Sequence, residues 1–289
     1  MSTALQVAAG HRHVIPPFDM GLIACYWLPL LKGVPVVAMS PFDWVRRPGM
    51  LLEVITRHHG THCWLPNFAY NLIAQRVDDH ALEHLDLSTM RAFVNCSEPI
   101  MVASHDAFRS RFERCGLKPT ALQTSYALAE NTFAVTHGGD DAGPTIDRVD
   151  EQTFASTGHA QTIGDDVSHP RTFVSSGRPL PETRIRILND AGEPVAERTV
   201  GQIAIASPCL MQGYFNNDDA TDQSVRDGWH VTGDLGYLAG DQLFVTGRNK
   251  DPIISGGKKF IRRTLRPLSA MSPASLRVAA SPLDWPTTG

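Results

Sequence analysis

Between residues 20 and 126, short apolar runs alternate with segments whose apolar residues recur at helical spacing. Three runs have the length and composition of buried strands, and they cover residues 34–39, 63–65 and 91–95. Apolar side chains three and four positions apart predict helices around residues 50–58 and 68–77, and a further surface helix over 106–115. Strands that alternate with helices form a parallel sheet covered on both faces. The pattern therefore predicts an α/β fold for this part of the chain.

The pattern changes after about residue 136. Residues 137–170 are rich in Gly, Asp, Thr and His and have few apolar anchors, which favours a long loop or insertion. Segments with strand-like alternation follow, at residues 183–188, 201–207 and 243–246. We therefore expect a smaller β-rich subdomain beside the α/β part. The last residues, from about 261, combine basic residues, serines and prolines without periodicity, which is typical of a disordered tail.

Composition excludes several classes of protein. The chain has 289 residues, of which 42% are hydrophobic and 19% charged, as in ordinary globular proteins. A net charge of -4 gives no reason to expect a nucleic-acid partner. The five cysteines form no C-x-x-C pair, and the N-terminus does not resemble a signal peptide, so we expect reduced thiols and a cytoplasmic protein.

The most apolar stretch covers residues 20–39, and Pro29, Lys32, Gly33 and Pro35 interrupt it. A membrane helix needs about 20 mostly uninterrupted apolar residues. The stretch therefore predicts no transmembrane segment, but a buried helix followed by a buried strand.

Two segments carry side chains suited to nucleotide chemistry. In SYALAE (residues 125–130), Tyr126 could stack on a heterocycle and Glu130 could hold Mg²⁺ bound to phosphates. In GWHVTGDLG (residues 228–236), glycines flank Asp234 on an expected tight turn, so that its carboxylate could accept from a sugar's hydroxyls. Alone, Tyr and Glu near a strand end usually have structural roles, and Asp234 could be a turn residue that caps its own backbone.

Two further segments are weaker. In GRNKD (residues 247–251), Arg248 could reach ribose or phosphate, and the polar loop could serve as a hinge. In FDMGL (residues 18–22), Asp19 could cap a helix. A solvated charge cluster and an ordinary helix start would look the same.

In this order, the segments resemble the adenylate-forming superfamily, and most closely its fatty-acyl-AMP ligase branch. The segments PNFAYNLIAQRV, LDLSTMRAFVNCSEPI, YALAENTFAV and SSGRPLP also match that branch, so that the resemblance covers roughly residues 15–260. It implies a carboxylic acid that attacks the α-phosphate of ATP to give acyl-AMP and pyrophosphate, with Mg²⁺ as cofactor. In this branch the acyl group passes to a carrier protein or polyketide synthase domain, and fatty acids are the expected substrates.

The resemblance also implies residue roles. Tyr126 would stack on adenine, Glu130 would hold Mg²⁺ as the catalytic carboxylate, and Asp234 would bind the ribose with help from Arg248. Asp251 would be the hinge between domains. The adenine-side wall would be formed by Asn95, Ser97, Glu98 and Pro99, and the acyl site would include Phe18, Asp19 and Gly21.

With these roles the chain divides into four parts. They are an α/β subdomain (1–135), an insertion loop and β-rich subdomain (136–246), a hinge with the start of a C-terminal domain (247–260) and the tail (261–289). We expect the chain to be the middle of a ligase, truncated or altered in reading frame at its end.

The sequence departs from the family pattern in ways that bear on activity. No segment before residue 15 resembles the Ser/Thr/Gly-rich loop that cradles the β- and γ-phosphates, and the lysine-bearing C-terminal domain is not recognisable. Lys258 and Lys259 cannot be assigned that lysine's role. Phe18 stands where the branch usually has His, and Ala127 where it usually has Gly. Two alternatives stay open: a ligase that transfers to coenzyme A, and a non-catalytic domain that keeps a nucleotide or acyl pocket.

The first prediction concerns catalysis by the chain alone. Because the phosphate loop and the catalytic lysine are not recognisable, pyrophosphate release by the purified chain with ATP and a fatty acid should stay at background. A coupled pyrophosphate assay measures this, with an intact ligase as positive control. Turnover comparable with the intact ligase would contradict the prediction.

Overall fold

The computed structural model describes residues 4–7, 20–139, 143–164, 170–248, 252–255 and 258–261. The chain divides into two compact units, and the division in the sequence falls between Gly247 and Arg248. The first unit contains a sheet in the order β2-β1-β3-β4-β5-β6-β9. Its strands are β1 (Ala4–Val7), β2 (Val36–Met39), β3 (His62–Leu65), β4 (Ala92–Asn95), β5 (Leu122–Ala127), β6 (Ala134–Gly138) and β9 (Arg178–Pro179). Strands β1 to β5 pair in parallel and β6 and β9 antiparallel, which confirms the predicted α/β fold.

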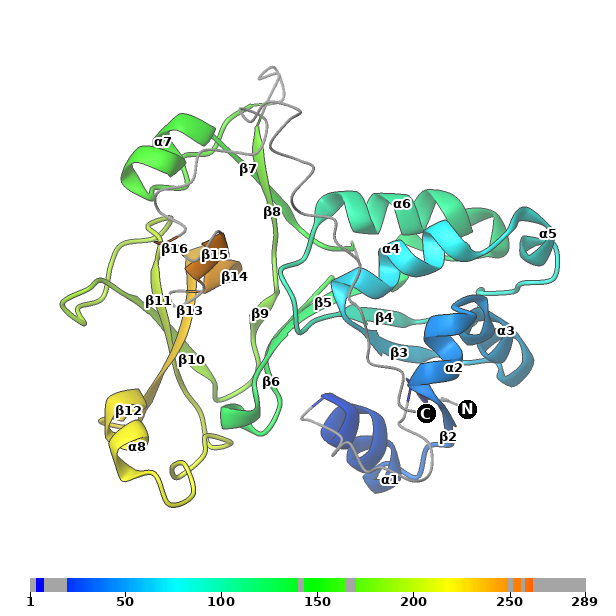
Figure 1. Cartoon of the computed structure of the whole chain (residues 1–289), viewed down its shortest axis with the longest axis horizontal. Coiled ribbons are helices and arrows are strands. Elements are labelled where there is room, and N and C mark those ends of the chain that lie inside the picture. The colour runs from blue at the N-terminus through cyan, green and yellow to red at the C-terminus, as the bar shows by residue number, and fades with distance from the viewer. Residues whose placement is uncertain are drawn as a thin grey trace. The chain divides into compact units, whose positions relative to one another are not determined.

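Helices connect the parallel strands (Figure 1). They are η1 (Met20–Trp27), α1 (Leu28–Leu31), α2 (Pro41–Arg46), α3 (Gly49–His58), α4 (Asn67–Arg76), α5 (Asp79–Leu82), α6 (Val102–Phe112), and the short η2 (Glu113–Cys115) and η3 (Pro119–Ala121). The helices predicted around 50–58, 68–77 and 106–115 are confirmed. The short helix η2 ends at Gly116, whose positive φ of 84° suits a glycine.

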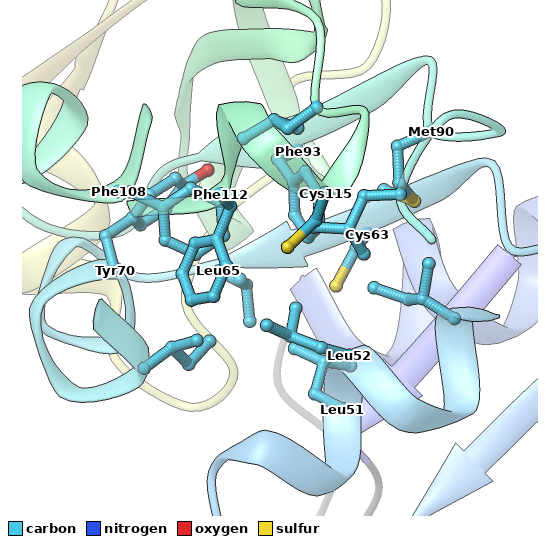
Figure 2. Packing of buried hydrophobic residues seen from close by; sticks show 14 of the residues in the cluster. Leu51, Leu52, Cys63, Leu65, Tyr70, Met90, Phe93, Phe108, Phe112 and Cys115 are labelled. Carbon is cyan, nitrogen blue, oxygen red and sulfur yellow. The ribbon is translucent and has the colours of Figure 1, made fainter. Parts of the chain in front are cut away.

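The largest apolar cluster covers one face of this sheet (Figure 2). Cys63, Leu65 and Phe93 point to that face because side chains alternate along a strand. Helices α3, α4 and α6 pack on them through Leu51, Leu52, Ile55, Ala69, Tyr70, Ile73, Phe108 and Phe112. Trp64 points to the opposite face, where its ring meets Phe133 at 5.0 Å between centroids. The packing on both faces fixes the carboxyl ends of β3, β4 and β5, where the candidate site lies.

A second sheet follows in the same unit, in the order β10-β11-β13-β12, with β14 paired to β13. Its elements are β10 (Arg184–Leu188), β11 (Gly201–Ala206), α8 (Asp218–Ser224), β12 (Val225–Arg226), β13 (Trp229–Ala239) and β14 (Gln242–Arg248). The predicted strands at 183–188, 201–207 and 243–246 are confirmed. Ile187, Ile203 and Leu243 share a cluster with Tyr126 and Val135 of the first sheet, so the two sheets have a common apolar core.

The expectation of a long loop over residues 137–170 is wrong for those of these residues that the structure describes. Strand β7 (Ile146–Val149) pairs with β8 (Arg171–Val174), and α7 (Glu151–Thr157) lies between them. The apolar anchors that this segment lacks come from elsewhere, because Tyr237 and Phe244 of the second sheet complete its core. The first sheet also continues past the expected boundary at residue 135, through β6 and β9.

The apolar stretch 20–39 forms the predicted helix and strand, but its expected burial is wrong. Only Ala24, Cys25 and Pro29 are buried, whereas Leu31 is 76% exposed. Strand β2 has no buried residue, because it lies at the edge of the sheet. Every helix within the described residues is too short or too polar to cross a bilayer.

The second unit contains a hairpin of β15 (Pro252–Ser255) and β16 (Lys258–Ile261), paired antiparallel. Asp251, the expected hinge residue, lies outside the described residues, as does the expected disordered tail beyond Ile261.

The second prediction tests the core of the first unit. Phe108 is fully buried, and its ring contacts those of Tyr70, Phe93 and Phe112. Phe108→Ala should lower the free energy of unfolding by about 3–5 kcal/mol, because the lost transfer energy adds to the cost of a cavity. Urea denaturation followed by circular dichroism measures this.

Phe215→Ala is the matched control. This ring is 93% exposed, so its loss should change the free energy by no more than about 0.5 kcal/mol. Equal effects of the two substitutions would show that the cluster around Phe108 does not stabilise the unit.

Candidate functional site

The candidate site begins at the carboxyl end of β5. The pairing of β5 with β6 is irregular here, because Tyr126 pairs with Thr136 and the next residue, Ala127, with Ala134. Such a bulge turns a side chain away from the direction that regular alternation would give it. The short helix η4 (Ala129–Asn131) follows at once and carries Glu130. Tyr126 is thus among the last paired residues of β5, and Glu130 lies just beyond the strand.

A second irregularity positions Asp234. Along β13, Val231 pairs with Ala204 and Leu235 with Gln202, so that residues 232–234 bulge out of the ladder. The expected tight turn is therefore wrong, because Asp234 lies on a bulge within a continuous strand. Gly233 makes the bulge possible with a positive φ of 77°. The hydroxyl of Thr232 donates to the carbonyl of Ile203 at 3.0 Å and accepts from the Asp234 N–H at 3.1 Å.

The two bulges bring their side chains together. The Tyr126 hydroxyl donates a hydrogen bond of 2.6 Å to Oδ2 of Asp234. Both residues are 8% exposed, and hydrogen bonds to a carboxylate in such surroundings are among the stronger ones. The Tyr126 N–H also donates to the hydroxyl of Thr136 at 3.1 Å. The structure therefore joins two residues that lie 108 positions apart and that the sequence had assigned to one site.

Glu130 has partners from the second sheet's connections. Its Oε1 accepts a hydrogen bond of 2.9 Å from the Tyr214 hydroxyl. Burial, together with this carboxylate, raises the pKa of Tyr214. The negative charges of Glu130 and Asp234 favour protonation of the buried His230. Burial has the larger effect, however, and lowers the pKa of this imidazole. Nδ1 of His230 is buried without a hydrogen-bond partner among the described residues.

The end of the neighbouring strand β4 carries the predicted adenine-side wall. Asn95 is fully buried and pairs with Thr124 of β5. Its Nδ2 lies 3.1 Å from Oδ1 of Asn67 and 2.9 Å from Nε2 of His105. The Asn95 side chain thus supports the strand end from within.

Residues 97–99, which follow the buried Cys96, are exposed. Ser97 has a positive φ of 73°, which is uncommon for a residue with a side chain. Glu98 accepts a hydrogen bond of 2.9 Å from the N–H of Phe68, in the first turn of α4, where a carboxylate is favoured by the helix dipole. Glu98 therefore has a structural contact, and its role in a nucleotide wall, like that of Pro99, stays a prediction.

The roles of four further site residues stay predictions. Phe18 and Asp19 lie outside the described residues. Gly21 is part of η1, a π-helix. Arg248 ends β14 as an exposed residue and belongs to the second unit.

The arrangement has the features of a ligand site. Side chains gather beyond the carboxyl ends of adjacent parallel strands, which is where open α/β sheets bind their ligands. Sequence analysis missed Tyr214 and His230 as neighbours of Glu130. His230 lies within the GWHVTGDLG segment and could have been noticed there, whereas no pattern marks Tyr214.

Comparison with known proteins decides the family. Residues 16–215, more than half of the chain, match the AMP-binding enzymes. The chain belongs to the AMP-binding enzyme family. Its resemblance to the fatty-acyl-AMP ligases is also confirmed. It is 32% identical over 279 residues to the long-chain-fatty-acid–AMP ligase FadD26 of Mycobacterium marinum, covering 90% of the chain and 47% of that relative.

Two further comparisons agree. The chain is 29% identical over 273 residues to TtuA of Teredinibacter turnerae, a medium-chain-fatty-acid–[acyl-carrier-protein] ligase, covering 87% of the chain and 42% of TtuA. A solved structure from work on fatty acyl-adenylate ligases of E. coli and L. pneumophila matches with a TM-score of 0.81 and 35% identity, over 90% of the chain and 46% of the solved one. This AMP-binding chain therefore spans less than half the length of the relatives it matches.

The third prediction concerns the histidine that supports Asn95. Burial lowers the pKa of His105 from 6.5 to about 4. The unfolded chain then binds a proton that the folded one excludes, so the free energy of unfolding should fall as pH drops from about 6.5 to about 4. This group's share is about 3 kcal/mol, measured by urea denaturation at several pH values.

His105→Gln should flatten that dependence, because Gln does not titrate. His58→Gln, an exposed histidine on α3, is the matched control and should leave the profile unchanged. If His105→Gln kept the full decline of the unaltered chain, protonation of His105 would not be its cause.

Proposed function

We propose that this chain provides the nucleoside-binding side of a site that activates a carboxylic acid with ATP. The observation that supports it most is the hydrogen bond between Tyr126 and Asp234, which holds an aromatic ring and a carboxylate together at the end of the parallel sheet. A carboxylate is an acceptor suited to the paired hydroxyls of ribose. A tyrosine ring is suited to stacking on adenine.

The remaining residues have roles that follow from their chemistry. Glu130 offers carboxylate oxygens, the ligand class that Mg²⁺ takes together with substrate phosphates. Tyr214 holds that carboxylate in place through its hydroxyl. Ser97, Glu98 and Pro99 form the adenine-side wall at the end of β4, and Arg248 assists at the ribose. Asp251 is the hinge, and Phe18, Asp19 and Gly21 lie at the acyl site.

The proposed reaction is acyl adenylation. A carboxylate oxygen of the acid forms a bond to the α-phosphorus of ATP, and the bond from that phosphorus to the bridging oxygen of pyrophosphate breaks. Bound Mg²⁺ would neutralise phosphate charge. The residues of this chain hold the adenosine end fixed, so that the α-phosphate meets the acid in one orientation.

Fatty acids are the substrate class we propose, with transfer of the acyl group to a carrier protein, since FadD26 and TtuA carry those functions in their names. The cytoplasm, which supplies ATP, is the proposed location. Because the chain spans less than half the length of its relatives, nucleotide binding is the part of the activity that this chain is expected to show by itself.

The fourth prediction tests the proposed ribose acceptor. Asp234→Asn should weaken binding of ATP to the full chain by about 1.5–3 kcal/mol, roughly tenfold or more, because hydrogen bonds to a charged group contribute that much. Isothermal titration calorimetry with Mg²⁺-ATP measures the affinity. Asn keeps the volume of the side chain and can still accept from Tyr126.

Asp219→Asn is the control, since Asp219 is an exposed acidic residue in the first turn of α8 and has no role in the proposed site. Equal affinities for Asp234→Asn and the unaltered chain would remove Asp234 from the nucleotide site. No measurable ATP binding by the folded, unaltered chain would contradict the proposed function itself.

A further inference from the structure

A cluster of metal-ligating side chains lies on α5 and on the two residues that follow it. His80, Glu83 and His84 each offer one ligand atom, and these atoms all lie within 4.8 Å of one another. Nδ1 of His80 lies 3.7 Å from Oε2 of Glu83, and the two imidazole centroids are 5.5 Å apart. The cluster belongs to no part of the proposed nucleotide site.

The backbone beneath the cluster is held in a helical turn. The N–H of Glu83 donates to the carbonyl of His80 at 3.3 Å, and the N–H of His84 to the carbonyl of Ala81 at 3.1 Å. Residues three and four positions apart therefore share one face. His80, Glu83 and His84 have this spacing, so that all three side chains can reach one ion.

Contacts on both sides fix this turn to the unit. The Asp78 side chain accepts from the N–H of Ala81 at 2.8 Å and caps α5. Leu82 is buried in the main apolar cluster. Asp79 pairs with Arg111 of α6, and the same guanidinium donates to the carbonyl of Val77. The ligand side chains thus project from a turn whose position is already set.

The chemistry of the three ligands selects a class of ion. Two imidazoles and one carboxylate suit borderline divalent transition ions such as Zn²⁺, whereas Mg²⁺ and Ca²⁺ prefer ligand sets made of oxygen alone. The side chains of His80 and Glu83 are 83% and 70% exposed. Water can therefore complete the coordination, and the exposed side chains can close onto the ion by rotation.

We propose that His80, Glu83 and His84 form a surface site for a divalent ion of the Zn²⁺ class. Because His80 lies in α5 and Glu83 and His84 directly follow it, the bound ion would hold the end of this helix in its helical turn. The site is independent of nucleotide and of the Mg²⁺ proposed at Glu130. Its presence can be tested with the metal alone.

Equilibrium dialysis of the full chain against Zn²⁺ tests the proposal, with Cys209→Ser in every sample because that thiol is exposed. We expect the reference chain to bind one Zn²⁺ more tightly than any other, and His84→Gln to lose this tight binding. The affinity of this site for Zn²⁺ should fall at least about tenfold, because even the loss of a residue that only hydrogen-bonds to a metal ligand lowers metal affinity by that much. Millimolar Mg²⁺ should not displace the ion.

The paired substitution His58→Gln with His59→Asn is the matched control. It removes two exposed histidines that are adjacent in sequence, and Asn tolerates the positive φ of 52° at residue 59. This control should bind Zn²⁺ as the reference does, and circular dichroism confirms that each variant is folded. Unchanged Zn²⁺ affinity in His84→Gln, or an equal loss in the control, would overturn the proposal, whatever the outcome of nucleotide binding.

Discussion

The hydrogen bond between Tyr126 and Asp234 is the contact on which the candidate site depends. A carboxylate that is 8% exposed has lost most of its water and needs donors from the protein. The Tyr126 hydroxyl supplies one across two sheets, while the Asp234 backbone is tied down by Thr232. Both partners lie at interruptions of regular pairing. The bulges in β5–β6 and β11–β13 therefore belong to the site as much as the side chains do.

The same principle joins other distant parts of the first unit. Asp147 of β7 accepts from the Tyr237 hydroxyl at 2.7 Å and from the Arg198 guanidinium at 3.0 Å. These two contacts tie β7 to Tyr237 of the second sheet and to Arg198, in addition to the apolar cluster that they share. A buried carboxylate without hydrogen-bond partners is costly. Such contacts therefore favour the one alignment of the segments in which the carboxylate keeps its partners. Apolar clusters supply most of the burial, and these polar contacts determine which segments meet.

Much of the fold follows from the sequence, and the exceptions have physical causes. Local periodicity is visible in the chain itself, so the strands around Cys63 and Ile187 could be predicted. The apolar core around residues 146–174 could not be predicted in this way, because Tyr237 and Phe244, which complete it, lie more than 60 positions later in the sequence. Asp234 was assigned to the site by its motif, but the motif suggested a turn. A bulge depends on the partner strand, and local sequence does not reveal that partner.

The charges around the site restrict what it can bind. Glu130 and Asp234 are carboxylates. Both favour the protonated form of His230, but burial has the larger effect, lowers the pKa of the imidazole and so favours its neutral form. The balance of these groups is negative, so a bare triphosphate would be repelled, whereas hydroxyls and divalent cations would be attracted. Asp234 is therefore suited to the sugar, and Glu130 to a metal that accompanies the phosphates. In the proposed function, an acidic pair can therefore serve an anionic substrate, because Asp234 would meet hydroxyls that donate hydrogen bonds and Glu130 would meet the divalent cation that accompanies the phosphates.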